Sequence, residues 1–151
     1  LKGFNPFVDD EVQPEGDTDS EQALCYLLQQ LKRHVPGGIN NTTSLFQWLN
    51  HFSETIAAFG TFNIILSNGE WLYSYCSTHL AYVERKFPFS KVTLIDREIS
   101  LDLSEHNSHE DQMIVIATKP LTANEDWKVF QRGEARLFKD GELHLERLSG
   151  E

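Results

Sequence analysis

The sequence predicts an α+β fold in which two helices precede a mostly antiparallel set of strands, with the helices covering one sheet face. Apolar residues recur at helical spacing as far as Gly60. Beyond that residue, short apolar segments are separated by Asn68-Gly69 and Asp140-Gly141, dipeptides typical of β-hairpin turns. A chain of 151 residues with 40% apolar content and ten phenylalanines can form the core of one domain.

The first helix is expected from Asp19 to His34. Thr18 and Glu21 have the spacing of a capping box, in which each side chain bonds the other residue's backbone N–H. This places Asp19 in the first turn, where the helix dipole favours a carboxylate. The Pro-Gly-Gly sequence at 36–38 ends the helix. Its apolar face is expected to consist of four leucines: Leu24, Leu27, Leu28 and Leu31.

The second helix is expected to begin at a cap on Thr43 or Ser44 and to end at Gly60. Its apolar side chains repeat on one face, which predicts a face buried in the core. The residues of this face are Leu45, Trp48, Leu49, Phe52, Ile56 and Phe59.

Short strands follow the helices, with a type I′ turn expected at Asn68-Gly69 and a second hairpin turn at Asp140-Gly141. The run from Ile64 to Leu66 is apolar without a break, which predicts a strand covered on both faces, and the strand beginning at Met113 is also expected to be buried. The expected strand segments are 62–67, 71–76, 80–85, 92–94, 99–103, 113–117, 134–138 and 143–148.

The net charge of −10 argues against binding to nucleic acid or to an anionic membrane, because no basic cluster offsets the acidic residues. No segment reaches the length of a membrane span, and no leader pattern is present. Cys25 and Cys76 have no metal-ligand or disulfide spacing and are expected to be buried thiols. Together these features predict a cytoplasmic protein.

His106 and His109, with acidic residues around them, have a spacing that could hold a metal ion on a helix. The turn-forming residues Asn107 and Ser108 between them favour a solvated loop instead, so we expect no metal site. The remaining histidines have no nucleophile at an interpretable distance. The chain therefore offers no complete catalytic set.

The order of several motifs resembles the C-terminal part of class II glutamine amidotransferases of the N-terminal nucleophile hydrolase superfamily, particularly the compact stand-alone bacterial branch. The resemblance covers nearly the whole chain, and it depends on the order and spacing of the motifs rather than on any one of them. The motifs are LKGF at 1–4, GDTDSE at 16–21, FNIILSNG at 62–69, YCST at 75–78, IATKPLT at 116–122, Trp127 and Gly133-Glu134.

This resemblance implies an Ntn-hydrolase-like αββα sandwich, of which residues 1–151 would be the C-terminal portion of a single type-2 domain. The nucleophilic N-terminal Cys and the oxyanion-binding Asn-Gly pair are then expected upstream of Leu1. Hydrolysis of a γ-glutamyl amide through a thioester would need no metal or organic cofactor. Such a portion is expected to show an unpaired sheet edge and exposed apolar surface.

The resemblance also implies roles for individual residues. Asp19 would bind the α-ammonium group of glutamine, with Thr18 as its supporting neighbour. A carboxylate held at a helix start suits this role because a charge-assisted hydrogen bond is strong and little ordering is needed. Ser77, Thr78 and Thr118 follow predicted strands and are candidates to line the same pocket, although such hydroxyls also commonly stabilise turns.

Two other functions stay open on the sequence alone. One is a γ-glutamyl hydrolase that acts on glutathione-like peptides. The other, of a different class, is a non-catalytic α+β module whose acidic surface binds a protein. For the amidotransferase, the expected partners are a small-molecule γ-glutamyl substrate and an ammonia-accepting protein, and the oligomeric state is open.

Overall fold

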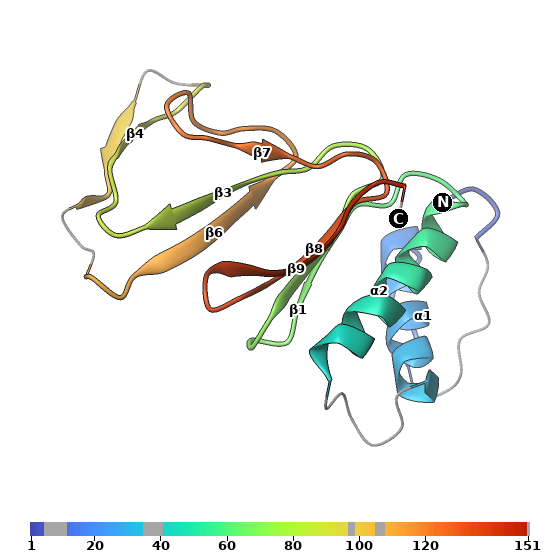
Figure 1. Ribbon diagram of the computed structural model, residues 1–151. Coiled ribbons are helices and arrows are strands. Elements are labelled where there is room, and N and C mark those ends of the chain that lie inside the picture. Colours follow the sequence, from blue (N-terminus) through green and yellow to red (C-terminus); the bar gives the residue numbers. More distant parts are fainter. Residues whose placement is uncertain (5–11, 35–40, 97–98, 105–107, 151) are drawn as a thin grey trace. The chain divides into compact units, whose positions relative to one another are not determined.

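The computed structural model describes residues 1–4, 12–34, 41–96, 99–104 and 108–150. The chain divides into two compact units, Leu1–Phe62 and Asn63–Glu151. The first unit contains the helices and the second contains the strands (Figure 1), so the predicted order of two helices followed by mostly antiparallel strands is confirmed. The expectation that the helices cover a sheet face stays a prediction.

Helix α1 spans Asp19–His34, as predicted. Half of the expected capping box is present, because the Thr18 hydroxyl accepts a hydrogen bond from the Glu21 N–H at 3.3 Å. The apolar face differs from the prediction: Leu27 is fully buried, but Leu24 and Leu28 are 37% and 41% exposed. Small and polar side chains complete the buried set, which is Ala23, Cys25, Leu27 and Gln29.

Helix α2 spans Thr42–Ala57, and its N-cap is Asn41 rather than the predicted Thr43 or Ser44. The Asn41 side-chain oxygen accepts hydrogen bonds from the N–H groups of Thr43 at 2.9 Å and Ser44 at 3.4 Å. A short carbonyl side chain satisfies these otherwise unpaired donors as well as a hydroxyl does. Four of the six predicted face residues are buried, namely Leu45, Leu49, Phe52 and Ile56.

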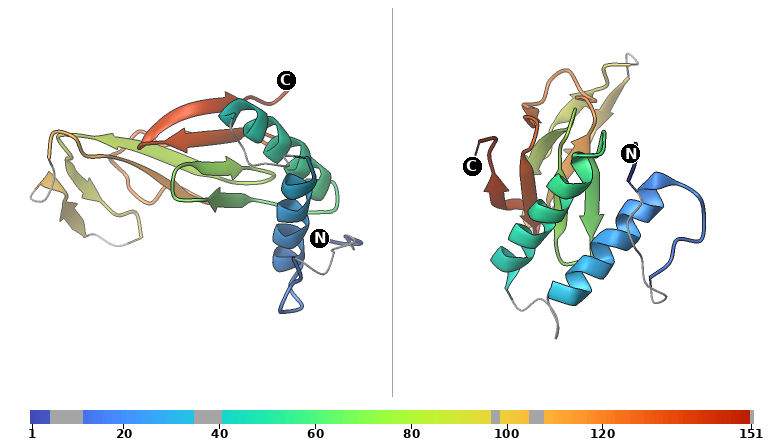
Figure 2. Two further views of the ribbon diagram at one scale, coloured as in Figure 1. Left: turned by 90° about the horizontal axis from the view of Figure 1, so that it is seen from below. Right: turned by 90° about the vertical axis from the view of Figure 1, so that its right-hand side faces the viewer.

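Aromatic rings fill the contact between the two helices, which lie side by side and run in opposite directions (Figure 2). Across this contact Phe52 of α2 packs edge-to-face with Tyr26 of α1 at 6.4 Å, and it stacks on Trp48 of its own helix with ring centroids 5.4 Å apart. Phe4 joins the cluster through Tyr26 and Phe59, at 5.6 and 5.3 Å. Such offset and edge-to-face pairs stabilise the helical unit beyond simple burial.

The second unit is built on a four-stranded antiparallel sheet in the order β1-β2-β8-β9. Every neighbouring pair in this sheet is antiparallel. Between β8 and β9 the register shifts at Leu137/Phe138. The strands are β1 Ile64–Ser67, β2 Leu72–Tyr75, β8 Ala135–Lys139 and β9 Glu142–Arg147.

Two smaller antiparallel sheets complete this unit, one in the order β6-β3-β7 and one formed by β4 and β5. Strand β7 was not predicted, because two residues carry too little pattern to be recognised. The long loop after β6 reaches the small hairpin through a bridge between Leu94 and Thr122. The strands are β3 Ala81–Lys86, β4 Lys91–Thr93, β5 Ser100–Asp102, β6 Gln112–Ala117 and β7 Lys128–Val129.

The two dipeptide turns differ from each other. Asp140 and Gly141 both have positive φ, 50° and 75°, between the paired residues Lys139 and Glu142, so this hairpin turns at the predicted dipeptide. A Cβ at Gly141 would lie 2.7 Å from the backbone of Gln112. This position therefore requires glycine for both its φ and its close approach to β6.

At the other hairpin the predicted two-residue turn is wrong. Strand pairing ends at Ser67 and Leu72, which leaves a four-residue connection in which Gly69 has positive φ and Asn68 does not. The Asn68 side-chain oxygen instead accepts hydrogen bonds from the N–H groups of Glu70 and Trp71, at 3.0 and 3.2 Å. Asparagine competes in this way for nearby backbone donors, which changes the turn.

The core of the second unit lies where the two larger sheets meet. It consists of Cys76, Leu80, Tyr82, Phe130 and Phe138. Strands β1 and β6 are less buried than predicted, since Ile65 is 49% exposed and Met113 is 38% exposed. Strand β1 is also an edge of its sheet. Neither helix of the described chain is long and apolar enough to cross a membrane.

Candidate functional site

Asp19 is the first residue of α1, and its side chain is 54% exposed. Its carboxylate accepts a hydrogen bond from the α-ammonium group of Leu1 and forms an ion pair with it. The hydrogen bond and the charge of this ammonium lower the pKa of Asp19 below its ordinary value. The carboxylate is thus ionised at neutral pH and lies exposed in the first turn of α1.

The turn before α1 is stabilised by Glu21 in a way the sequence did not predict. Instead of reaching back to Thr18, the Glu21 carboxylate accepts hydrogen bonds from the N–H groups of Glu15 at 2.7 Å and Gly16 at 2.9 Å. A Cβ at Gly16 would lie 2.9 Å from a Glu21 carboxylate oxygen, so glycine leaves room for this contact. The result is a defined approach of the chain to Asp19.

In the second unit, Ser77 and Thr78 form a turn that is held by the side chain of Asn63. The Asn63 carbonyl oxygen accepts hydrogen bonds from the N–H groups of Ser77 at 2.9 Å and Thr78 at 3.1 Å, and its amide donates to the Thr78 hydroxyl at 2.7 Å. Ser77 is buried and Thr78 is exposed. Asn63 was missed as a site residue because its partners lie 14 and 15 positions away.

The same turn is tied to the segment before β8. The Cys76 N–H donates to the Glu134 carbonyl at 3.0 Å, and the Gly133 N–H donates to the Cys76 carbonyl at 2.8 Å. Gly133 has a φ of 86°, which explains the glycine of this motif. Two of the recognised motifs are therefore in direct contact.

Thr118 directly follows β6 and is exposed. Antiparallel pairing of Ala81 with Ala117 places Thr118 at the end of the sheet where the chain enters β3 from Thr78. The candidates Thr78 and Thr118 therefore share one end of this sheet. Asp19 belongs to the other unit, so a pocket formed jointly by all of these residues stays a prediction.

The two cysteines are free and buried, as predicted. Burial raises the pKa of the thiol of Cys25 and of Cys76 above the ordinary value. A thiol held in its neutral form is a poor nucleophile, because the thiolate is the attacking species. Neither cysteine suits the role of a catalytic nucleophile.

The histidine pair considered for metal binding is only partly described, since His106 lies outside the described residues. The ring of His109 lies against Phe87, with centroids 4.1 Å apart. Among the residues that the structure describes, no group of three His, Cys, Asp or Glu side chains could hold a metal ion.

A partly buried ion pair that the sequence did not reveal lies at the base of the loop after β6. Arg85 of β3 donates through Nε and Nη2 to the two carboxylate oxygens of Glu125, at 2.7 and 2.8 Å. The hydroxyl of Thr122 also donates to Glu125, at 2.5 Å, and accepts from the indole N–H of Trp127 at 2.9 Å. This network gives a structural reason for Thr122 and Trp127 in the recognised motifs, because both side chains belong to it.

The Glu125 side chain is 9% exposed and the Arg85 side chain 17%. Hydrogen bonding from Arg85 lowers the pKa of the Glu125 carboxyl below its ordinary value. The stabilising effect of this ion pair is therefore fully present above the pKa of glutamate in the unfolded chain. It is lost as the pH falls through the lower pKa of Glu125 in the folded protein.

We expect Glu125→Gln to lower the free energy of unfolding by about 2 kcal/mol at pH 7, since it removes a charge-assisted, two-pronged pair. Urea unfolding of both proteins between pH 7 and pH 3 measures this. The difference between them should shrink as the pH falls below the ordinary glutamate pKa, about 4.3. A difference that stays constant over this range would contradict the assigned ionisation.

Comparison with known proteins identifies the family of this chain. The family model described as class II glutamine amidotransferases matches residues 1–149. The chain is a class II glutamine amidotransferase family member. This confirms the resemblance inferred from the order of its motifs.

Relatives of this amidotransferase chain include the Escherichia coli protein YafJ, which bears the name of a glutamine amidotransferase. The chain is 37% identical to it over 142 residues, which are 94% of the chain and 56% of YafJ. A Haemophilus influenzae protein of the same designation is 41% identical over 145 residues, covering 94% of the chain and 48% of that protein. The chain thus spans about half the length of these relatives.

A solved structure agrees with the amidotransferase assignment. The crystal structure of a predicted glutamine amidotransferase from Pseudomonas aeruginosa superposes with a TM-score of 0.84 at 36% identity. The match covers 95% of the chain and 56% of that structure. The α+β fold, with two helices and mostly antiparallel strands, is therefore the fold of this family.

Proposed function

We propose that this chain is the C-terminal portion of a glutaminase domain that hydrolyses a γ-glutamyl amide through a thioester on an N-terminal Cys. Membership of the class II amidotransferase family supports the reaction class. The nucleophile and the oxyanion-binding Asn-Gly pair would be contributed by sequence upstream of Leu1. The two buried cysteines support this, because neither has the accessible, readily ionised thiol that the reaction requires.

The observation that carries the proposal is the position of Asp19, an exposed carboxylate in the first turn of α1 within the recognised GDTDSE motif. In the proposal, this carboxylate binds the α-ammonium group of glutamine. The Thr18 hydroxyl and the Glu21 carboxylate hold the backbone on either side, so the carboxylate is positioned before substrate binds. Preorganisation of this kind lowers the ordering cost of binding.

In the same proposal, Thr78 and Thr118 line the substrate pocket at the end of the sheet that they share. Ser77 supports the turn that contains Thr78. Asn63 is added to this group because it fixes the turn through three hydrogen bonds. Ammonia released from glutamine would pass to an acceptor, which is a separate protein or a further part of the full-length protein. No metal or organic cofactor takes part in the proposed chemistry.

The first test uses the purified 151-residue chain. We expect no release of ammonia or glutamate from glutamine, because the reacting thiolate is absent. A coupled glutamate assay measures this, with the full-length protein as the positive control. Turnover by the pure chain would overturn the assignment of the nucleophile to an upstream segment.

A γ-glutamyl hydrolase acting on glutathione-like peptides is the alternative within the same chemistry. The two differ in the group attached to the γ-carbonyl, which Asp19 does not contact. Comparing glutamine with γ-glutamyl dipeptides as substrates of the full-length protein separates them. A full-length protein that turns over neither would favour the non-catalytic interaction module.

A further inference from the structure

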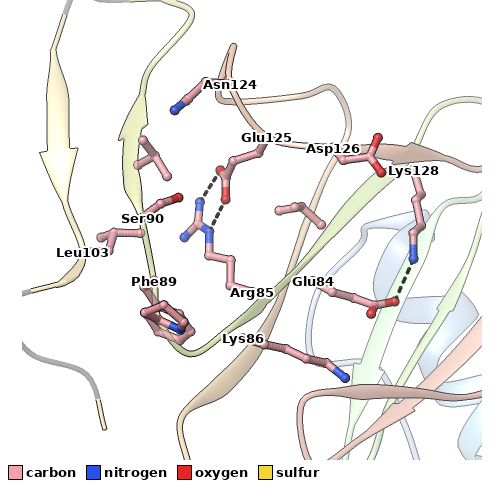
Figure 3. A pocket seen from close by; sticks show the side chains of 13 residues that line it. Glu84, Arg85, Lys86, Phe89, Ser90, Leu103, Asn124, Glu125, Asp126 and Lys128 are labelled. Atoms are coloured by element: carbon pink, nitrogen blue, oxygen red, sulfur yellow. Dashed lines mark hydrogen bonds and ion pairs between the residues drawn. The ribbon is translucent and has the colours of Figure 1, made fainter. Parts of the chain in front are cut away.

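A pocket of about 360 Å³ lies entirely within the second unit, between β3, the start of β4 and the loop that follows β6. Figure 3 shows Arg85 reaching toward Glu125 in this pocket, with Phe89, Ser90 and Leu103 on the other side of the guanidinium. The volume falls in the range of small-molecule sites in proteins. None of the proposed glutaminase residues lines it.

The guanidinium of Arg85 has one edge occupied and one edge open. Glu125 takes Nε and one hydrogen of Nη2. Nη1 has no hydrogen-bond partner among the residues that the structure describes, and together with the second hydrogen of Nη2 it forms another two-pronged donor edge. This edge matches the two oxygens of a second carboxylate.

The pocket wall next to this edge is apolar. Phe89 and Val92 are 7% and 2% exposed, so their side chains are fixed by packing. Pro88, Val83 and Leu103 extend the same surface. A ligand that fills the pocket therefore needs an apolar body beside its carboxylate.

The charges around the pocket limit the charge of the ligand. Three cations line it, and three acids line it as well. The pocket is thus charge-balanced within a chain whose net charge is −10. A balanced site accepts one carboxylate more readily than a phosphate or another multiply charged anion. The charged lining residues are Arg85, Lys86, Lys128, Glu84, Glu125 and Asp126.

We propose that this pocket binds a small monocarboxylate with an apolar body, whose carboxylate pairs with the open edge of Arg85. A free apolar amino acid and the C-terminal carboxylate of a short peptide both carry this chemistry. The Arg85–Glu125 pair holds the guanidinium in place, so that the ligand meets an oriented donor rather than a flexible side chain. The site is separate from the proposed glutaminase chemistry and does not depend on it.

Calorimetric titration of the purified protein with N-acetyl-L-leucine, L-leucine and N-acetyl-L-leucinamide tests the proposal. We expect both carboxylates to bind. The amide should bind at least tenfold more weakly, because it cannot form a bidentate ion pair with the Arg85 guanidinium. Tighter binding of the acetylated acid assigns the site to a peptide end, and tighter binding of leucine assigns it to a free amino acid.

Two variants probe the site itself. Arg85→Lys keeps a cation for Glu125 but removes the second donor edge, and it should weaken carboxylate binding at least tenfold. Ser90→Trp fills the pocket from an exposed position without altering the ion pair, and it should abolish binding. Lys119→Gln is the matched control, because Lys119 pairs with Asp96 at an exposed site outside the pocket.

Equal affinity for the acid and the amide would overturn the proposal. So would unchanged binding by a folded Ser90→Trp variant, or no binding of either carboxylate by the wild-type protein at about 10 mM ligand, a concentration that would detect even millimolar affinity. Because the readout is binding, these outcomes are independent of whether the full-length protein hydrolyses glutamine.

Discussion

Replacing Glu134 by alanine is expected to lower the free energy of unfolding by about 3 kcal/mol, because it leaves a buried guanidinium without its partner. The side chains of Glu134 and Arg136 are only 7% and 8% exposed. A Glu134 carboxylate oxygen accepts hydrogen bonds from Arg136 Nη1 at 3.1 Å and from the Gln131 N–H at 2.9 Å. Urea unfolding followed by tryptophan fluorescence measures the loss.

The rings around Arg136 explain why its partner matters. The guanidinium lies over the ring of Phe130 at 4.3 Å and that of Tyr82 at 5.2 Å, so it connects β8 to the core between the sheets. Its other acidic neighbour, Glu146, is 3.6 Å from Nε and is 44% exposed. Among the described residues Nε has no hydrogen-bond partner. Without Glu134, the charge would depend on a longer ion pair to a half-exposed carboxylate.

A double variant separates the ion pair from simple loss of packing. Glu134→Leu with Arg136→Met replaces both charges by apolar groups, and we expect it to recover most of the stability lost by Glu134→Ala. Glu142→Gln is the matched control, since it removes an ion pair to Lys86 whose two side chains are each 54% exposed. A loss at Glu134 no larger than at Glu142 would contradict this account.

Local chemistry was enough to predict most elements of the fold. Asp140-Gly141 was correctly recognised because both residues adopt positive φ, a backbone requirement that glycine and aspartate meet. Asn68-Gly69 was misread because the Asn68 side chain bonds the backbone and lengthens the turn. The same kind of competition placed the α2 cap at Asn41. In both of these errors, an asparagine side chain determined the local conformation.

The site was less predictable because its contacts join distant parts of the sequence. Arg85 and Glu125 are 40 positions apart, and no local pattern indicates that they pair. Asn63 reads as the first polar residue of a strand, although its side chain organises the turn at Thr78. Asp19 was selected as a candidate because the order of motifs carries information that a single capping pattern does not.

The largest effect on activity is expected at Asp19. In the full-length protein, Asp19→Asn should reduce kcat/KM for glutamine about 100-fold, which corresponds to the loss of one charge-assisted pair to the substrate ammonium. The asparagine keeps the size and one hydrogen-bond acceptor, so the start of α1 should remain intact. Steady-state kinetics, with circular dichroism to check helix content, measures both.

Asp17→Asn provides the control, because Asp17 is an exposed carboxylate two residues upstream on the same turn. It changes the net charge by the same amount and should leave kcat/KM unchanged. A substrate without the α-ammonium group, glutaramate, supplies the second comparison. With glutaramate the wild-type protein and Asp19→Asn should have similar kcat/KM, because the group that Asp19 binds is absent.

The combination of variant and substrate distinguishes binding from structure. If Asp19 acted only by stabilising the helix start, the variant would slow glutamine and glutaramate hydrolysis by the same factor. If Asp19 binds the ammonium, the variant lowers kcat/KM for glutamine but not for glutaramate. The difference between these two effects then measures the interaction between Asp19 and the ammonium. An equal loss on both substrates would therefore assign Asp19 to the fold, and unchanged kinetics on glutamine would remove it from the site.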